Sequence, residues 1–563
     1  MVRRRLGILA IVCVSIASGL VMQASGWAQT SNYALVRALH GGTAQIDQWH
    51  WETKDESWYK GHFYSVKAPI LSALTLPVYA LLKDAGGDRW AYETARSARE
   101  NSSWRWRPTA TPEALYGQNR LRTYRVRGRI EQATPIIWVL GLFGNVLPAL
   151  GLMLLVRWAA ERIEPGYGTA AALTLGLATM VFAFSTLYFS HVLAALLGFA
   201  AFALLLRERD GPERKLLVAL AGVLAGVGFA TEYPLAFAGA VVGLYAISRG
   251  DRIRRGLVYA AGCVTGSIPV FAYNLAAFGS LTHFSYTGAV KDQGVTGHDV
   301  LGSNDSGFFG IGLPNPKVAL ELLFSSKGLF LITPVLALGV LGAVLLYRRG
   351  RRAEALTIAG VAAVYLVYNS GYWLPFGGGT PGPRFLVPVL PFLALGLALA
   401  WRRFPAVTLG LAVPSALFMF TATLTFPLIG NDDLGFWWKL MKASNFVGTV
   451  ATPLGAGHHW AGIAPVLIAA AVAAALGVAA TPGWRAAFDA RWGALAVLGW
   501  AALAATLPWV VGADQSVIDG DSGAAVLIAI FAGVALLTVG AAALRARQHA
   551  VDDQRAAPLA AEA

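Results

Sequence analysis

The amino-acid sequence predicts an all-α, polytopic integral membrane protein with about 14 transmembrane helices. Of the 563 residues, 56% are hydrophobic and only 13% are charged, whereas soluble domains average about 25% charged residues. The 18 Trp residues also suit a membrane protein, because Trp favours the bilayer interface. Apolar runs close to the roughly 20 residues that a transmembrane helix needs recur along the whole chain.

The predicted spans start within the first ten residues and continue almost to the C-terminus. Two of them, 215–230 and 233–248, are short enough to be tilted or broken. The full set is 6–25, 134–156, 168–187, 189–207, 215–230, 233–248, 256–278, 328–347, 354–373, 385–401, 405–427, 463–480, 491–511 and 523–544.

Basic clusters alternate with these spans so that all of them fall on one side of the membrane. Cytoplasmic loops carry an excess of Lys and Arg, so this side is expected to be the cytoplasm, with both termini inside. The net charge of +14 is therefore mainly a topology signal and not a nucleic-acid footprint. The abundance of Ala, Gly and Arg favours a bacterial inner membrane. The clusters are Arg3 to Arg5, Arg157 and Arg162, Arg207 to Lys215, Arg249 to Arg255, Arg348 to Arg352, Arg402-Arg403, Arg485 to Arg491, and Arg545 with Arg547.

Two N-terminal segments leave alternatives for the topology. Residues 1–28 have the basic start, apolar run and small residues of a cleavable signal peptide, but we favour a retained first span. The 69–83 segment is apolar yet only about 15 residues long, so we interpret it as an interfacial or re-entrant helix. A span there would move every later basic cluster to the opposite side. This interpretation leaves the arginine-rich segment 84–133 on the outer surface.

The expected organisation places the chemistry before the C-terminal spans, which carry almost no polar residues. It comprises a first transmembrane helix (1–28), an external loop with interfacial helices (29–133), a transmembrane core (134–430), C-terminal transmembrane helices (431–545) and a cytoplasmic tail (546–563).

The first outer loop holds the densest group of chemically useful residues, in the stretch TKDESWYKGHFYSVKAP. An acid can act as a general base toward a hydroxyl group. Lys and Arg can bind a phosphate leaving group and stabilise its developing charge. Ordinary ion pairs of a solvated loop are the alternative. The candidates in the loop are Asp47, Asp55, Glu56, His62, Tyr64 and Lys67.

Further polar residues fall at the outer ends of later spans. Polar groups near membrane depth are costly and tend to be functional, although helix caps and solvated loops are the ordinary alternatives. Arg384 ends the segment GYWLPFGGGTPGPR and is a basic residue on the outer side at the mouth of a span, so it needs a partner. The other candidates are His191, Glu232, Tyr233, Asn274, His283, Tyr286, His298, Asp299 and Lys327.

At these residues the chain resembles the GT-C superfamily of polytopic glycosyltransferases, in particular relatives of the lipid A aminoarabinose transferases and protein O-mannosyltransferases. That superfamily has a first outer loop with an amphipathic helix, an acid and a Tyr-x-x-Lys-Pro-like element before an interfacial helix. The matching pieces are SNYALVRALHGGTAQID (31–47), GHFYSVKAP (61–69) and the 69–83 segment. A bacterial subgroup is similar over roughly residues 30–400, at FSHVLAAL (189–196), ATEYP (230–234), YNLAAFGS (273–280), SSKGLFLITPVLAL (325–338) and GPRFLVPVLPF (382–392).

One departure from the resemblance concerns the catalytic base. Many GT-C enzymes carry an Asp just outside the first span, ahead of a Tyr-Ala pair, whereas this chain has TSN (30–32) before Tyr33-Ala34. The base is then expected to be Asp55, because it lies near GHFYSVKAP, with Asp47 as the alternative. Loss of activity is the remaining alternative.

The resemblance implies a glycosyltransferase that moves a sugar from a polyprenyl-phosphate-sugar to an envelope acceptor (lipid, glycan or protein) on the outer face of the membrane. Arg384 and Lys67 would bind the donor phosphate, with arginines of 84–133 as helpers. Such folds can use a divalent metal, but no residues here have convincing ligand spacing. No P-loop or Rossmann fingerprint is present. Substrate contacts are expected from His62, Tyr64, His191, Glu232 and Tyr233.

Two other functions remain open from the sequence. Many spans suit a transporter or flippase of a lipid-linked or small solute, but transporters place polar sites near the midplane and often contain internal repeats. Here the polar residues cluster outside and no repeat is evident. The missing early Asp also leaves open a non-catalytic envelope scaffold. Cys13 and Cys263 lie inside apolar runs, so no disulfide is expected.

Overall fold

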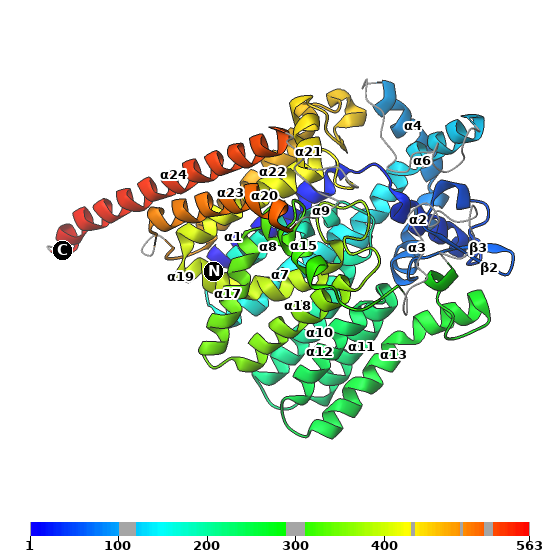
Figure 1. Ribbon diagram of the computed structural model, residues 1–563, viewed down its shortest axis with the longest axis horizontal. Coiled ribbons are helices and arrows are strands. Elements are labelled where there is room, and N and C mark those ends of the chain that lie inside the picture. Colours follow the sequence, from blue (N-terminus) through cyan, green and yellow to red (C-terminus); the bar gives the residue numbers. More distant parts are fainter. Residues whose placement is uncertain are drawn as a thin grey trace.

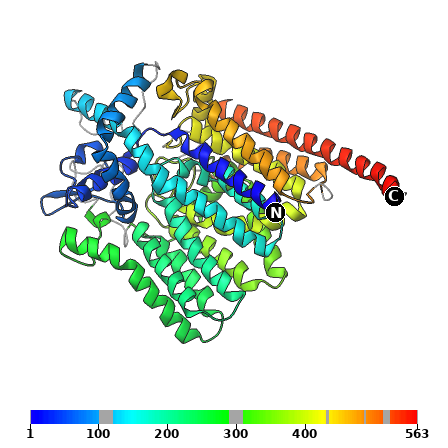
Figure 2. The same cartoon turned by 180° about the vertical axis from the view of Figure 1, so that it is seen from behind.

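The fold is a bundle of helices with a smaller outer layer at one end, formed mainly by the N-terminal segments (Figures 1 and 2). The computed structural model describes residues 2–100, 120–288, 310–429, 434–484, 488–511 and 522–561. Within these ranges nine helices are long and apolar enough to cross a membrane, or ten if one bent pair counts as a span. The prediction of an all-α, multi-pass membrane protein is therefore confirmed.

The outer layer is built mostly from the first hundred residues. Its elements are α1 (Val2–Gly19), which enters the bundle, β1 (Val21–Met22), α2 (Trp27–His40), the 3-10 helix η1 (His50–Glu52), β2 (Glu56–Tyr59), β3 (His62–Ser65), α3 (Ile70–Asp84) and α4 (Gly87–Glu100).

The bundle follows in chain order. Its first part is α6 (Arg120–Gly141), the π-helix η2 (Leu142–Val146), α7 (Leu147–Ile163), α8 (Gly168–Leu177), α9 (Met180–Ser185), α10 (His191–Arg209), α11 (Lys215–Thr231), α12 (Leu235–Ile247), α13 (Arg252–Phe278) and the 3-10 helix η3 (Ser285–Gly288). Its second part is α15 (Pro316–Phe324), α16 (Leu329–Ile332), α17 (Val335–Arg348), α18 (Arg352–Ser370), the 3-10 helix η4 (Arg384–Val389), α19 (Leu390–Arg403), α20 (Pro405–Leu424), α21 (Leu434–Lys442), β4 (Gly448–Thr449), the π-helix η5 (Thr452–Ala456), α22 (Trp460–Ala480), α23 (Ala490–Val511) and α24 (Ser522–Ala561).

Every predicted span overlaps one or more helices, but three spans differ from the prediction. One ends earlier than expected and two are interrupted. The expected span 6–25 ends early: the first helix stops at Gly19, because the following residues form β1, which pairs with β4. The expected span 168–187 is broken into α8 and α9, where the Thr179 side chain caps α9. The expected span 328–347 is also interrupted, and the helices on its two sides meet at 94° before Pro334. A proline there lacks the N–H that would continue the preceding helix.

Close helix packing in the bundle depends on small residues. Helices α11 and α13 face each other through Gly222 and Gly226 on one side and Gly262 and Gly266 on the other. A Cβ added to any of these glycines would lie 2.1–2.2 Å from a backbone oxygen of the partner helix. Such small-xxx-small contacts are typical of helices packed in membranes.

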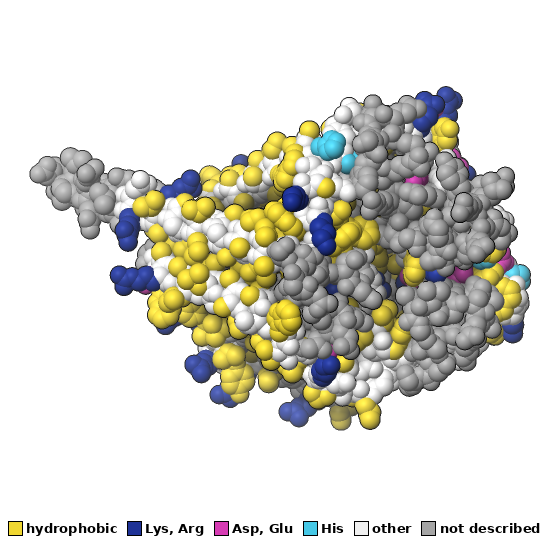
Figure 3. All heavy atoms as spheres, turned by 45° about the horizontal axis from the view of Figure 1, so that its top comes forward, with side chains coloured by type: hydrophobic (Ala, Val, Ile, Leu, Met, Phe, Trp, Pro, Cys, Tyr) yellow, Lys and Arg dark blue, Asp and Glu magenta, His cyan; other side chains and the backbone are white. Residues whose placement is uncertain are grey.

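The basic clusters meet at one end of the bundle, as the alternation of spans and charges predicted. Glu164 after α7 accepts hydrogen bonds from Arg349 after α17 and from Arg402 at the end of α19. At the same end Arg255 binds Glu208 at 2.9 Å, which links α13 to α10. Figure 3 shows Lys and Arg gathered along the left and lower edges of a broad hydrophobic face.

Helix α3 does not span the bundle. It lies against the ends of neighbouring helices. One side is buried, where the Thr75 hydroxyl is 2.5 Å from the Tyr188 hydroxyl. The other side exposes Leu74 and Leu81. One buried and one exposed apolar face suit the predicted interfacial position.

Candidate functional site

A β-hairpin in the outer layer brings Asp55 and Lys67 together. Strands β2 and β3 pair in the register that places Glu56 opposite Ser65, around a turn at Lys60 and Gly61 that both have positive φ. Asp55, just before β2, and Lys67, just after β3, therefore lie at the same open end of the ladder, opposite the turn. The Lys67 ammonium lies 2.5 Å from the Asp55 carboxylate, and the two side chains are 23% and 13% exposed.

The environment of Lys67 joins this pair to two later residues. Burial lowers the pKa of the Lys67 ammonium, and the Asp55 carboxylate opposes that effect. The Arg384 guanidinium lowers this pKa further, whereas the Glu232 carboxylate raises it. The sequence-predicted candidates Asp55, Lys67, Arg384 and Glu232 thus lie within electrostatic range of one another, although they come from distant parts of the chain.

Arg384 is held by the loop that precedes η4. Gly377 in this loop has φ +84°, and a Cβ there would lie 2.3 Å from the Arg384 Nε. The guanidinium carbon lies 5.5 Å from the ring centre of Phe189 and 5.3 Å from that of Phe385. Its buried Nε has no hydrogen-bond partner among the described residues. A planar cation held in this way suits an oxyanion ligand such as phosphate.

His191 and Glu232 form a buried pair next to this cation. His191 begins α10 and Glu232 ends α11, and their side chains are 6% and 9% exposed. The His191 Nδ1 lies 2.9 and 2.8 Å from the two carboxylate oxygens. His191 and Glu232, both predicted to contact substrate, therefore bind each other. The second ring nitrogen of His191, Nε2, takes no part in this pair.

An aromatic hydroxyl cluster that the sequence did not single out as a unit lies at the same site. Trp373 donates a hydrogen bond of 3.0 Å to the Tyr286 hydroxyl, which also binds the Tyr372 hydroxyl. Burial raises the pKa of Tyr286, and Asp55 adds to that effect while Arg384 opposes it. The sequence had indicated Tyr286 as a single candidate and the GYW segment as the start of the loop that ends in Arg384, but not their contact.

The two predicted tyrosines hold the walls of the site together. Tyr64 donates a hydrogen bond of 3.2 Å to the Ala277 carbonyl near the end of α13 and packs on Phe278. The Tyr233 ring packs against Phe284 with ring centres 5.1 Å apart. These contacts fix the hairpin and the end of α11 beside η3.

Asp47 lies in a different setting from Asp55. One of its carboxylate oxygens accepts a hydrogen bond of 2.7 Å from the backbone N–H of Phe63, and the other lies 2.8 Å from the His62 imidazole. The Asp47 and His62 side chains are 40% and 45% exposed. This pair anchors the loop before η1 to the hairpin, and its two predicted members lie together at the surface.

Glu56, beside Asp55 at the start of β2, is a buried acid with a strongly raised pKa. It is 4% exposed, and burial together with the neighbouring Asp55 raises the pKa of its carboxyl to about 9. One carboxyl oxygen lies 3.7 Å from the His50 Nδ1. Glu56 is therefore neutral at pH 7, whereas its neighbour Asp55 faces a cation.

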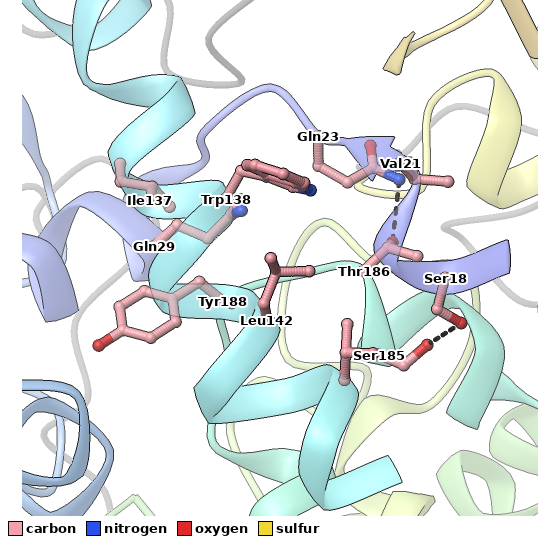
Figure 4. A pocket seen from close by; sticks show the side chains of 12 residues that line it. Ser18, Val21, Gln23, Gln29, Ile137, Trp138, Leu142, Ser185, Thr186 and Tyr188 are labelled. Carbon is pink, nitrogen blue, oxygen red and sulfur yellow. Dashed lines mark hydrogen bonds between the residues drawn. The ribbon is translucent and has the colours of Figure 1, made fainter. Parts of the chain in front are cut away.

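A small polar cavity lies elsewhere, between the end of α1, η2 and α9 (Figure 4). Its volume of about 10 Å³ fits a single water and no sugar. Gln23 crosses it to donate a hydrogen bond of 3.0 Å to Thr186, and Gln29 and Tyr188 also contribute to its wall. None of the predicted catalytic residues lines this cavity.

The remaining candidates have local roles or lie outside the described residues. Asn274 donates a hydrogen bond of 3.1 Å to the Leu281 carbonyl, and His283 packs on Tyr59. No group of three or more His, Cys, Asp or Glu that could hold a metal occurs in the described part of the chain. His298, Asp299 and most arginine side chains of 84–133 lie outside the residues whose side chains are described.

The site therefore combines a carboxylate, two cations and a buried His-Glu pair at the end of a membrane bundle opposite its basic loops. No family model matches the chain, and no curated protein matches it in sequence. Three solved structures are similar to it, two of ArnT and one of an oligosaccharyltransferase, both members of the GT-C superfamily.

ArnT from Cupriavidus metallidurans bound to undecaprenyl phosphate is 16% identical, with a TM-score of 0.42 over 93% of this chain and 86% of that one. The same protein in the apo state is 15% identical, with a TM-score of 0.44 over 84% and 76%. The apo Archaeoglobus fulgidus oligosaccharyltransferase is 11% identical, with a TM-score of 0.43 over 85% of this chain and 57% of that one. At these identities and TM-scores the similarity does not assign a function, which has to be proposed from this chain's own residues.

Proposed function

We propose that this protein is a membrane glycosyltransferase that moves a sugar from a polyprenyl-phosphate-sugar donor to an envelope acceptor on the outer face of a bacterial inner membrane. The observation that carries the proposal is the Asp55–Lys67 contact of 2.5 Å within electrostatic range of Arg384. A base and two phosphate-binding cations are the groups that such a transfer needs.

Lys67 and Arg384, which we call the phosphate clamp, bind the donor phosphate. The lipid tail lies in the bilayer beside the exposed apolar helices, and the sugar extends toward the hairpin. When phosphate arrives, Lys67 turns from the Asp55 carboxylate to the phosphate oxygens. This exchange frees Asp55 to accept a proton from the acceptor hydroxyl, so the base becomes active only when donor is bound.

The acceptor oxygen then attacks the anomeric carbon, and the bond from that carbon to the phosphate oxygen breaks. The phosphate clamp stabilises the charge that develops on the leaving phosphate. Positioning donor and acceptor against a fixed hairpin supplies much of the remaining rate enhancement. Asp47 is a weaker candidate for the base, because its carboxylate is half-exposed and already binds His62 and the Phe63 N–H.

The test supplies the purified protein with a panel of labelled polyprenyl-phosphate-sugars and envelope acceptors. Transfer is compared between wild type, Asp55→Asn, Asp47→Asn and Arg384→Ala. We expect Asp55→Asn and Arg384→Ala to lose activity and Asp47→Asn to retain most of it. Full activity in all three variants would contradict the site assignment, and no transfer from any donor by the wild type would contradict the function.

A second candidate function, transport of a lipid-linked solute, is favoured by the interrupted segment around Pro334. The helices on its two sides are bent by 94°, and transporters often use such discontinuous helices. Reconstitution into sealed vesicles separates the two functions. Movement of a labelled polyprenyl-phosphate-sugar across the bilayer without transfer to an acceptor supports the transporter.

A further inference from the structure

The buried His191–Glu232 pair lies beside the phosphate clamp without belonging to it. His191 is 4% exposed, and its Nδ1 faces both oxygens of the Glu232 carboxylate. The opposite ring nitrogen, Nε2, is buried and has no hydrogen-bond partner among the described residues. A buried polar atom of this kind is costly unless a ligand satisfies it.

The aromatic rings around His191 also contact Arg384 and so indicate which ligand could satisfy Nε2. Phe189 and Phe385 each contact both His191 and Arg384, with His191 ring centres at 5.7 and 5.8 Å and the Arg384 guanidinium carbon at 5.5 and 5.3 Å. The imidazole and the guanidinium therefore pack against the same two rings. Glu232 also acts electrostatically on Lys67. A phosphate bound by the phosphate clamp thus lies next to the His191 ring.

We propose that His191, oriented by Glu232, donates a hydrogen bond and then a proton from Nε2 to the phosphate bound by Lys67 and Arg384. This inference rests on the proposed function and deepens it. Glu232 accepts the Nδ1–H, which fixes the ring orientation and stabilises the imidazolium. The structure thereby assigns the pair to the leaving-group side of the reaction, opposite Asp55.

The transfer step then balances in atoms and charge. The acceptor O–H proton passes to Asp55 while the acceptor oxygen bonds to the anomeric carbon. The electron pair of the broken carbon–oxygen bond stays on the phosphate oxygen. His191 gives its Nε2 proton to that phosphate, so the lipid phosphate leaves as a monoanion. Asp55 then releases its proton to water and the neutral imidazole takes one up from water, which restores both groups.

The charged side chains around His191 include Glu232, Arg384 and Lys67, which act electrostatically on one another. Tyr365 and Tyr368 of α18 also lie within electrostatic range of Glu232. A free phosphomonoester loses its second proton near pH 6, roughly. The shared proton is therefore lost as pH rises, and the affinity contributed by His191 falls with it.

The experiment measures undecaprenyl phosphate binding by the full-length protein in lipid nanodiscs, from about pH 6 to about pH 9. Undecaprenol, which lacks the phosphate, is the ligand control. The variants are His191→Gln and Glu232→Gln, which keep polar side chains of similar size. His458→Gln is the matched control. His458 is also buried, but it binds the Phe446 carbonyl, in a part of the chain far in sequence from His191.

At about pH 6 we expect His191→Gln and Glu232→Gln to bind undecaprenyl phosphate about tenfold more weakly than wild type, the loss expected for one charge-assisted hydrogen bond. The difference shrinks toward about pH 9. The ³¹P resonance of the bound lipid should titrate at a different pH in wild type and in His191→Gln, a change that a purely structural role would not produce. His458→Gln should match wild type.

Two outcomes overturn the inference and are distinguishable. If wild type prefers undecaprenyl phosphate to undecaprenol but both pair variants share its affinity and ³¹P titration, His191 does not contact the phosphate, and the phosphate clamp still stands. If wild type binds the two lipids equally, the proposed function falls together with the inference.

Discussion

The Ser31 hydroxyl in α2 donates a hydrogen bond of 2.5 Å to the main-chain carbonyl of Asp55, and it also lies 2.7 Å from the Ser65 hydroxyl. Helix α2 is the element in which the GT-C resemblance leads one to expect an acid. Instead, it holds a small polar residue that binds both strands of the hairpin at the open end of the ladder. In the proposed function the base comes from the hairpin and not from this helix, and Ser31 of the helix fixes the backbone of Asp55.

Replacing Ser31 by Ala should slow transfer without abolishing it. The variant loses both hairpin contacts, each contributing about 1 kcal/mol, so Asp55 is less well positioned. We expect kcat to fall about tenfold while KM for the donor stays close to wild type. Steady-state transfer assays measure this split. Ser57→Ala is the control, since Ser57 is also buried in the hairpin but makes only a 3.5 Å contact with the Tyr64 carbonyl. Equal kcat values for both variants would contradict a positioning role for Ser31.

The Asp55–Lys67 pair predicts opposite effects of one substitution on binding and on catalysis. Asp55→Asn removes the carboxylate that competes with phosphate for Lys67. Transfer should fall by about 10² to 10⁴, as expected for loss of a general base, while undecaprenyl phosphate binds as tightly as to wild type or more tightly. Lys67→Met should weaken that binding about tenfold or more. Parallel transfer and lipid-binding measurements test this, and weaker binding by Asp55→Asn would show that Asp55 itself holds the lipid phosphate.

Adjacent glycines offer a matched test of Arg384. Gly377 and Gly378 both have positive φ, so replacing either by Ala strains the backbone. Only the Cβ at Gly377 would meet Arg384, at 2.3 Å from Nε, whereas the nearest atom at Gly378 is Leu374 Cδ2 at 3.7 Å. Gly377→Ala should therefore lose about tenfold or more in undecaprenyl phosphate affinity, and Gly378→Ala should lose little. Equal losses would indicate that loop strain, and not displacement of the guanidinium, is responsible.

The sequence was a good guide to elements that repeat a simple pattern. Long apolar runs predicted the membrane helices, and the alternation of basic loops predicted that residues such as Glu164, Arg349 and Arg402 share one end of the bundle. The apolar segment 69–83 was predicted to be a helix that does not span, because it is too short, and α3 occupies Ile70–Asp84. Each of these predictions depends on local composition and length, which the sequence displays directly.

The details of the site were harder to predict because they depend on contacts between distant residues. Nothing in the sequence indicates that Ser31 binds the backbone of Asp55, or that Phe189 and Phe385 border both His191 and Arg384. The breaks in the predicted spans were missed for a related reason. A helix interruption inside an apolar run is stabilised by tertiary packing, which overrides the hydropathy pattern.

Glu56 supplies a prediction about stability that is independent of catalysis. Burial raises the pKa of its carboxyl to about 9 in the folded protein, above its ordinary value of 4.5. The folded state therefore binds a proton that the unfolded state has released between these two values. The stability that this neutral acid contributes is complete below about pH 4.5 and is lost as pH rises through about 9.

Glu56→Gln keeps the shape of the side chain but cannot ionise. Thermal unfolding of the detergent-solubilised protein should give the same Tm for variant and wild type near pH 5, and a Tm several degrees higher for the variant near pH 8, roughly. Glu93→Gln is the control, because Glu93 lies on the exposed side of α4 in an ion pair with Arg89. If Glu56→Gln instead lowers Tm at both pH values, the carboxyl is ionised in the folded protein and pairs with His50, which would make it a charged neighbour of Asp55.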